Sequence, residues 1–228
     1  IYVHQFYISL GHIDQNSLYR SNNHWMKRTT FRLAESANIK ALGLQVNAAL
    51  DGYRQHQEHP YTSTSSSYFN VFSHINDKSP MTPGVNSLGL PYNVTDNPVD
   101  ETAGDAGYQR SIVNVINGKG ELVWSCLWVD GLKVRLASNY RYYGETYKNW
   151  RKDAAQYDWD SDVAQYANKP QLSHTSGTGY SYTNQAFLEY ANTFGQHNIS
   201  ALGGFEQYYE KGESYGATRI GYDFPIDQ

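Results

Sequence analysis

The chain has 228 residues, enough for one sizeable all-β domain or two small domains, and its 15% aromatic content with 21 tyrosines and 19 glycines favours strands and turns. The formal charge of −4 comes from 18 basic and 22 acidic residues mixed along the chain, without the clustered basic patch of a nucleic-acid-binding protein. The single cysteine, Cys126, excludes an internal disulfide, and no run of about 20 apolar residues is present to form a membrane-spanning helix.

The first predicted elements are strands. Residues Ile1 to Leu10 read as a strand from the start, and because no initiating Met precedes them we expect a fragment or a processed chain. Residues Trp25 to Leu33 are expected to form the next strand. From Ala41 to Asp51, apolar and polar side chains alternate with period two, which is the pattern of a strand with two different faces.

Two long polar stretches follow, Gly52 to Gly107 and Gly144 to Gly179, each rich in turn-forming and polar residues. Compact soluble domains rarely contain loops of this length, whereas outer-membrane barrels combine short turns at one end with long loops at the other. Within the first stretch, Ser66 to Ile75 are expected to form a short helix.

The clearest strand is Gly131 to Tyr143, where aliphatic residues and tyrosines alternate with the cations Lys133, Arg135 and Arg141. A cation facing the middle of a lipid bilayer costs about 2 to 4 kcal/mol, whereas a water-filled lumen tolerates it. We therefore predict that these three residues face a barrel lumen. The same alternation also fits a half-exposed sheet in a soluble protein.

The C-terminal part predicts further strands at Ser181–Thr193, Ile199–Tyr209 and Tyr215–Tyr222, with a hairpin turn at Phe194–Ile199. Eight residues separate Tyr182 from Tyr190, about 26 Å along a strand, which is near the spacing of the two aromatic girdles of a barrel. In total the chain has room for roughly ten strands.

The segment Asp158-Trp159-Asp160-Ser161-Asp162 places carboxylates at alternate positions, a spacing that can gather ligands for calcium. The EF-hand pattern fails, because Val163 stands in place of the glycine and Lys169 in place of the bidentate Glu. We favour an acidic loop without a metal, and Asp158, Trp159 and Asp160 are the residues predicted to contact a ligand there, with Trp159 suited to stacking on a sugar.

Catalytic signatures are not found in the sequence. The run His56-Gln57-Glu58-His59 lacks the HExxH spacing and reads as a solvated loop. There is no G-x-S-x-G and no glycine-rich phosphate loop. We therefore expect no catalytic residues, no enzymatic activity, no metal and no cofactor.

Several motifs together resemble one known family. They are YTNQAFLEYANTFGQHNISALGGFE from Tyr182 to Glu206, GLKVRLASNYRYY from Gly131, the opening ISLGHIDQ with Trp25–Leu33, and the loop elements Pro80–Pro83, Gly89-Leu90-Pro91-Tyr92, Asn97-Pro98 and Gly107-Tyr108. In this order they are similar to the barrel of SusC/RagA-like TonB-dependent outer-membrane transporters.

The resemblance implies an all-β fold of antiparallel strands that form part of a transmembrane β-barrel, about 22-stranded in the full family, with long extracellular loops. Residues 1–228 would be a partial segment with early to middle strands, without a plug domain or a TonB box. Such a protein sits in the bacterial outer membrane and imports an oligosaccharide or a peptide. The implied partners are the remaining strands and the plug, a SusD-like surface lipoprotein, TonB through a segment that this chain lacks, and outer-membrane lipid, but no nucleic acid.

Two alternatives come from other classes. A soluble secreted β-sandwich that binds carbohydrate predicts that Leu132, Val134 and Leu136 face Leu42, Leu44 and Val46 across a core about 10 Å thick. A β-rich hydrolase would need converging acid and base groups, such as Asp158 or Glu206.

Overall fold

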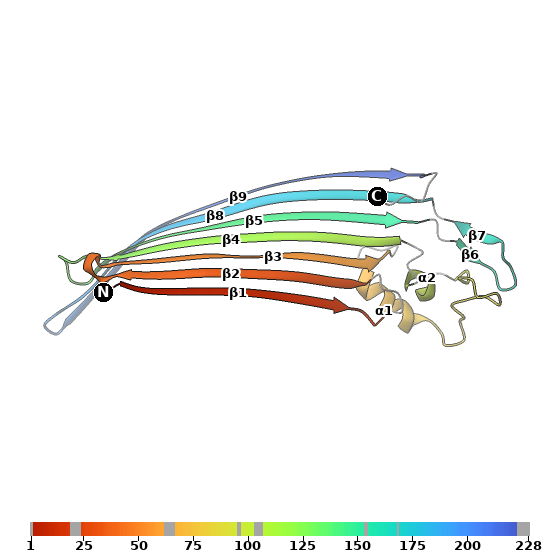
Figure 1. Cartoon of the computed structure of the whole chain (residues 1–228), viewed down its shortest axis with the longest axis horizontal. Helices are drawn as coiled ribbons and strands as arrows, with labels where there is room; N and C mark the ends of the chain where they lie inside the picture. Colours follow the sequence, from red (N-terminus) through yellow and green to blue (C-terminus); the bar gives the residue numbers. More distant parts are fainter. Residues whose placement is uncertain are drawn as a thin grey trace.

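The computed structural model describes residues 2–18, 24–61, 67–94, 97–102, 107–152, 155–167 and 169–222. Its main feature is a single antiparallel sheet of seven long strands in the order β1-β2-β3-β4-β5-β8-β9, so each strand pairs with its neighbours along the chain (Figure 1). The strands are β1 (Tyr2–Asn16), β2 (Trp25–Ile39), β3 (Leu44–Pro60), β4 (Gly107–Ser125), β5 (Leu132–Arg151), β8 (Gln171–Phe194) and β9 (His197–Ile220). The predicted all-β antiparallel class is therefore confirmed.

The connections differ between the two ends of the sheet. At one end they are tight: the 3₁₀ turn η1 (Lys40–Leu42) with Gly43 at φ 63°, the segment 126–131, and the turn at Gly195 with φ 63°. These φ values favour glycine because a Cβ is strained there. At the other end lie the long connections 17–24, 61–106 and 152–170. Figure 1 shows the helices and the small sheet gathered at this loop end.

The loop end carries all remaining regular structure. Helix α1 (Ser67–Asp77) and helix α2 (Pro98–Thr102) belong to the connection between β3 and β4, and the small sheet of β6 (Ala155–Tyr157) and β7 (Ala164–Ala167) belongs to the connection between β5 and β8. The expected helix is confirmed, although Ser66, like Ile1, lies outside the described residues. No helix among the described residues is long and apolar enough to cross a membrane.

Little of this structure is buried. The fully buried apolar side chains include Val71, Val115 and Trp150, whereas Phe6 is 68% exposed and Leu10 is 79% exposed. A soluble sheet of this size would bury such residues against a second layer. The seven-stranded sheet has no second layer in the described structure, so one of its faces leaves large apolar side chains uncovered.

The sandwich alternative is contradicted by this topology. Strands β3 and β5 lie in the same sheet, on either side of β4, and Val46 pairs with Leu122, which in turn pairs with Leu136. These residues lie side by side on one face and do not oppose each other across a core. Leu42 belongs to the η1 turn.

Several predicted strand boundaries were wrong. The predicted loop stretches were too long, because β3 continues to Pro60, β5 continues to Arg151 and β8 begins at Gln171. The two predicted strands after the hairpin turn are one strand, β9, of 24 residues. In both cases the strands continue beyond the aliphatic stripe into segments with polar residues on both faces, where period two disappears although the backbone pairing persists.

Candidate functional site

The unbroken register gives the sheet two chemically different faces. The apolar face carries Leu132, Val134 and Leu136 of β5, and it is completed by same-face residues of the other six strands. These are Phe6, Ile8 and Leu10 of β1; Phe31 and Leu33 of β2; Leu44, Val46 and Leu50 of β3; Ile116, Leu122 and Trp124 of β4; Leu188 and Tyr190 of β8; and Phe205 and Tyr209 of β9.

Aromatic residues border this apolar face at two levels. Towards the loop end, Tyr140, Tyr180, Tyr182 and Tyr209 form a cluster, with ring centroids 6.1 Å apart for Tyr140–Tyr180 and 5.2 Å apart for Tyr182–Tyr209. Towards the turn end, Trp124 has its ring 5.7 Å from that of Trp128. We call the part of the apolar face between these two levels the apolar band. Glu35 also lies on this face, where His4 of the edge strand lies 3.5 Å away.

The opposite face, here called the polar face, carries a chain of side-chain contacts across five strands. Ser36 donates to the Asn47 Oδ1 at 2.7 Å, and the Asn47 Nδ2 donates to Glu121 at 2.9 Å. Arg135 lies 3.9 Å from Glu121 and binds Glu189 at 2.5 Å. The contacts therefore run from β2 through β3, β4 and β5 to β8, and they fix the side chains of this face relative to one another.

Two hollows lie mainly on the polar face. The larger, of about 840 Å³, is lined by residues of six strands that include Gln5, Asn47, Glu121 and Gln185. The second, of about 600 Å³, lies over β5, β8 and β9 and is lined by Arg141, Glu145 and Tyr208 among others. Both are rich in groups that donate or accept hydrogen bonds.

The three predicted lumen residues are all on this polar face. Lys133 and Arg141 are exposed, and Arg135 is half-buried between the two carboxylates named above. Arg141 lines the second hollow. The structure thus brings Arg135 and Arg141 into the polar surface of the sheet and places Lys133 on the same face at the turn end.

The loop end is held together by two buried asparagines. Asn86 is 4% exposed, and its Nδ2 donates to the carbonyl oxygens of Asp158 and Ser161 at 3.0 and 2.9 Å. Its Oδ1 accepts from the backbone N–H groups of Leu88 and Leu90 at 3.0 and 2.9 Å. Because Asn86 and Asp158 come from different connections, this side chain fastens the two connections to each other.

Asn97 is the second of these asparagines and is 1% exposed. Its Nδ2 donates to the carbonyl oxygens of Gly84 and Tyr92 at 2.8 and 2.9 Å, while its Oδ1 caps α2 by accepting from the N–H of Val99 at 3.1 Å. Pro98 then occupies the first helical position, where its missing N–H is not needed.

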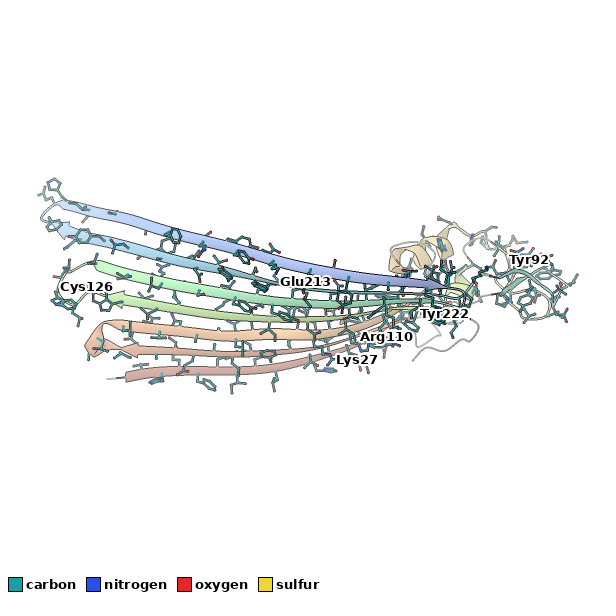
Figure 2. The ribbon with its side chains drawn as sticks, turned by 90° about the horizontal axis from the view of Figure 1, so that it is seen from above. Lys27, Tyr92, Arg110, Cys126, Glu213 and Tyr222 are labelled. Atoms are coloured by element: carbon teal, nitrogen blue, oxygen red, sulfur yellow. The ribbon has the colours of Figure 1, made fainter. Side chains whose placement is uncertain are left out.

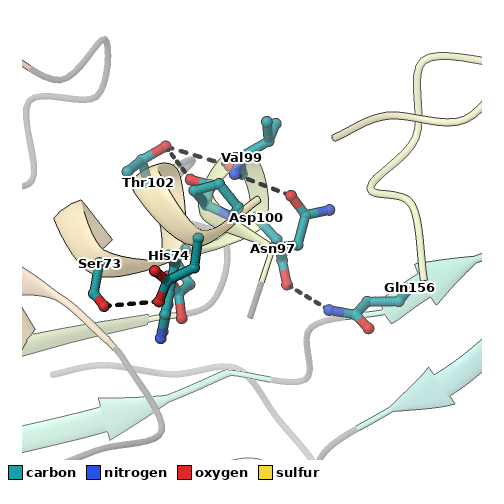
Figure 3. A network of polar contacts seen from close by, with 10 residues as sticks. Ser73, His74, Asn97, Val99, Asp100, Thr102 and Gln156 are labelled. Carbon is teal, nitrogen blue, oxygen red and sulfur yellow. Dashed lines mark hydrogen bonds and ion pairs between the residues drawn. The ribbon is translucent and has the colours of Figure 1, made fainter. Parts of the chain in front are cut away.

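Figure 3 shows the polar contacts that connect α1 and α2 with each other and with β6. His74 of α1 lies 2.8 Å from Glu101 of α2, and Gln156 of β6 donates to Asp100 of α2 at 3.3 Å. Backbone hydrogen bonds also join Tyr157 to Pro91 and Asn93. Together these contacts join the described parts of the connections 61–106 and 152–170 into one unit, here called the loop body.

The predicted ligand-contact residues lie on this body. Asp158 and Asp160 are exposed and Trp159 is 48% exposed, with its ring 6.0 Å from that of Tyr92. The carbonyl oxygen of Trp159 accepts from the N–H and the hydroxyl of Ser87 at 3.0 and 2.7 Å. The carboxylates therefore stand on an ordered turn, but no group of three or more His, Cys, Asp or Glu among the described residues is arranged to hold a metal.

Two histidines meet where the strands reach the loops. His24 and His59 have ring centroids 4.7 Å apart, and both line a third hollow, of about 400 Å³, beside Phe72 of α1. Burial, and secondarily the neighbouring His59, lower the pKa of His24 from 6.5 to about 4. At neutral pH this imidazole is uncharged.

Sequence reasoning missed Asn86, Glu121 and Glu189. Their partners are distant in the chain, 72 residues away for Asn86 and Asp158, and no local pattern marks such contacts. The residues of the hydrolase alternative are also separated, because Asp158 lies in the loop body whereas Glu206 lies near the turn end of β9, where it accepts from Gln185.

The structure is a single antiparallel sheet with one apolar and one polar face, with tight turns at one end and ordered loops at the other. Neither a family model nor a curated protein matches the chain. Among solved structures, a chain of the RagAB peptide importer in its 'closed-closed' state matches with a TM-score of 0.67 and 18% sequence identity over 97% of this chain. The match covers 24% of that longer chain, so this chain spans about a quarter of its neighbour's length. At this identity the likeness establishes the fold.

Proposed function

We propose that this chain is a segment of the wall of a TonB-dependent outer-membrane transporter that imports a nutrient, either a peptide or an oligosaccharide. The fold of the peptide-importer neighbour supports this role, and so does the resemblance of the sequence motifs to SusC/RagA-like transporters. We also propose that the role is transport and not catalysis.

The height of the apolar band is the observation on which the proposal mainly rests. Ten residues of β5 separate Leu132 from Tyr142, which is about 33 Å along a strand and about 25 Å along the normal of a barrel whose strands tilt by about 40°. This is the height of the lipid-facing band of outer-membrane barrels. The opposite, polar face then lines the lumen, where Arg135 and Arg141 are solvated.

The arrangement of loops assigns the two sides of the membrane. Outer-membrane barrels have short periplasmic turns and long extracellular loops. In this proposal η1 and the turn at Gly195 are periplasmic, and the body fastened by Asn86 and Asn97 is extracellular. That body, with Trp159 and Tyr92 on it, is where a nutrient or a SusD-like surface lipoprotein would make contact. The remaining strands, the plug and the TonB-contacting segment are supplied by the rest of the transporter.

The test begins with fractionation of cells that express the full-length polypeptide carrying this chain. Recovery in the outer membrane, together with TonB-dependent uptake of a labelled peptide mixture or a labelled oligosaccharide mixture, is the expected outcome. Peptides are the first mixture to try because the structural neighbour is a peptide importer. A soluble protein, or a membrane protein whose deletion changes neither uptake, would contradict the proposal.

A further inference from the structure

The apolar face changes character just beyond the aromatic residues at its loop-end border. Along the same face, β2, β3, β4 and β5 now carry Lys27, Arg54, Arg110 and Lys148. We call these four residues the cationic belt. The register sets them close together, since Lys27 pairs with His56, and Arg110 lies between Glu58 and Lys148. Figure 2 shows Lys27 and Arg110 towards the loop end of the strands, far from Cys126 at the turns.

The belt is compact and ordered by aromatic rings. Three of the cations surround His56 on this face, because Lys27 pairs with His56, Arg54 lies two residues before it on β3, and Arg110 pairs with Glu58 two residues after it. The Arg110 guanidinium lies 4.5 Å from the centre of the Tyr108 ring, and the Lys148 ammonium lies 5.9 Å from the same ring. On β2, the Lys27 ammonium lies 5.8 Å from the Trp25 ring. Rings packed against cations hold them in place without neutralising them.

Two carboxylates offset part of the positive charge. Glu58 binds Arg110 at 2.7 Å and Asp14 lies 3.4 Å from Lys27. Positive charge nevertheless stays accessible to solvent on the belt at Lys27 and Arg54. Lys27 is 52% exposed, and Arg54 is exposed and forms no ion pair with any residue that the structure describes.

We propose that the cationic belt binds the phosphate groups of lipid headgroups that border the apolar band. The inference rests on the proposed function, because the belt reaches headgroups only when the band lies in a bilayer. Basic side chains attract anionic lipid surfaces over the range of a Debye length, and a guanidinium can bind a phosphate through two parallel hydrogen bonds. Trp25, which is partly exposed, also suits this level, since amphipathic rings favour the membrane–water interface.

The belt faces away from the lumen, which separates it from the nutrient path. The polar face carries its own cations, Arg32 on β2 and Lys119 on β4, which are exposed like Arg54. Removing this pair deletes the same amount of charge from the opposite face of neighbouring strands. The double variant Arg32→Ala/Lys119→Ala is therefore a matched control for Lys27→Ala/Arg54→Ala.

The experiment titrates the full-length polypeptide, purified in a neutral detergent, with lipid A carrying two phosphates, and counts bound lipid by native mass spectrometry. We expect Lys27→Ala/Arg54→Ala to raise the dissociation constant about tenfold, and the control pair to leave it within about twofold. Enzymatically dephosphorylated lipid A should bind all three proteins equally weakly. Heat-modifiable mobility on gels verifies that each variant is folded.

Equal losses in the two double variants, or no loss in either, would overturn the proposal. So would binding of dephosphorylated lipid A as tight as that of the phosphorylated form. Competition with inorganic pyrophosphate tests whether the belt binds free phosphate. If pyrophosphate displaces lipid A at equal concentration, the site is one for soluble phosphate and not for a lipid headgroup. A polypeptide absent from the outer membrane would instead refute the proposed function, so the two failures are distinguishable.

Discussion

At the scale of single residues, Asn86 is the side chain on which the loop body most depends. It satisfies two carbonyl oxygens of one loop and two N–H groups of its own loop while almost fully buried. Each buried polar group left without a partner costs about 1 to 3 kcal/mol. We expect Asn86→Ala to release the 158–161 turn from the first loop, which limited proteolysis of the folded protein would show as cleavage about tenfold faster in both connections.

Asn93 provides the control for that experiment. It belongs to the same loop and its side chain is exposed, while its backbone N–H, which a substitution retains, donates to Tyr157 at 2.9 Å. Asn93→Ala should therefore leave the cleavage rate unchanged. Equal sensitivity of the two variants would show that Asn86 does not hold the loops together.

His24 makes the stability of the loop ends of the strands depend on pH. Burial favours the neutral imidazole and lowers the pKa of His24 to about 4, whereas the unfolded segment protonates at about 6.5. The stability contributed by the neutral ring is present above pH 6.5 and is lost as the pH falls towards 4. Hydrogen exchange of the segments around His24 and α1 should therefore speed up on acidification more in the wild type than in His24→Asn, when the two are compared at each pH.

A parallel acid response in the two proteins would contradict this assignment. Comparison at the same pH is essential, because the chemical exchange rate itself changes with pH and cancels only in the ratio. A segment from the turn end, such as 195–200, is the internal control and should respond identically in both proteins.

At the scale of one strand, β5 tests the proposed assignment of its two faces to lipid and to the lumen. Leu136 lies in the apolar band and Ala137 lies on the polar face, opposite Glu121. A cation facing lipid near the midplane costs about 2 to 4 kcal/mol, whereas a cation in the lumen beside a carboxylate is tolerated. We expect Leu136→Arg to reduce strongly the amount of folded protein in the outer membrane and Ala137→Arg to leave it nearly unchanged. The reverse order would mean that the faces are assigned the wrong way round.

Strands also show what the sequence can and cannot predict. The two faces of β5 and the hairpin turn at Gly195 were predicted correctly, because strict alternation and a glycine turn are local signals. The part of β3 from Gly52 to Pro60 falls in a predicted loop, because both of its faces are polar. Within β9, the run Glu210-Lys211-Gly212-Glu213 resembles a turn, yet it pairs residue by residue with β8. Pairing of this kind depends on the neighbouring strand and leaves no trace in the local sequence.

The loop body, too, has features that local sequence signals mark and features that depend on distant partners. Asn97-Pro98 enters the sequence analysis only as a loop element of the resemblance, although an Asn before a Pro is also a local helix-start signal, and in the structure Asn97 caps α2. The bond from Asn86 to Asp158 joins two different loops, so no local sequence pattern predicts it. The predicted contact residues at 158–160 are placed on an ordered turn by a residue that the sequence did not single out.

At the scale of the whole molecule, the sheet has two open edges. All 24 residues of β9 are exposed, and β1 at the other edge is almost entirely exposed as well. A long unpaired edge presents a row of N–H and C=O groups, and these groups must be satisfied where lipid replaces water. In the proposed transporter, further strands pair with β1 and β9.

We therefore expect the 228-residue chain, produced alone in detergent, to form mixed oligomers and aggregates through β1 and β9, whereas the full-length polypeptide is monodisperse. Size-exclusion chromatography with light scattering distinguishes the two cases. Supplying the rest of the polypeptide as a separate chain should restore a defined complex, because new strands then pair with both edges. A stable monomer of 25.9 kDa with cooperative unfolding would contradict the open-edge interpretation. Such a monomer would mean that water alone satisfies the backbone N–H and C=O groups at the edges of this sheet, whereas a part of a transmembrane barrel needs neighbouring strands for them.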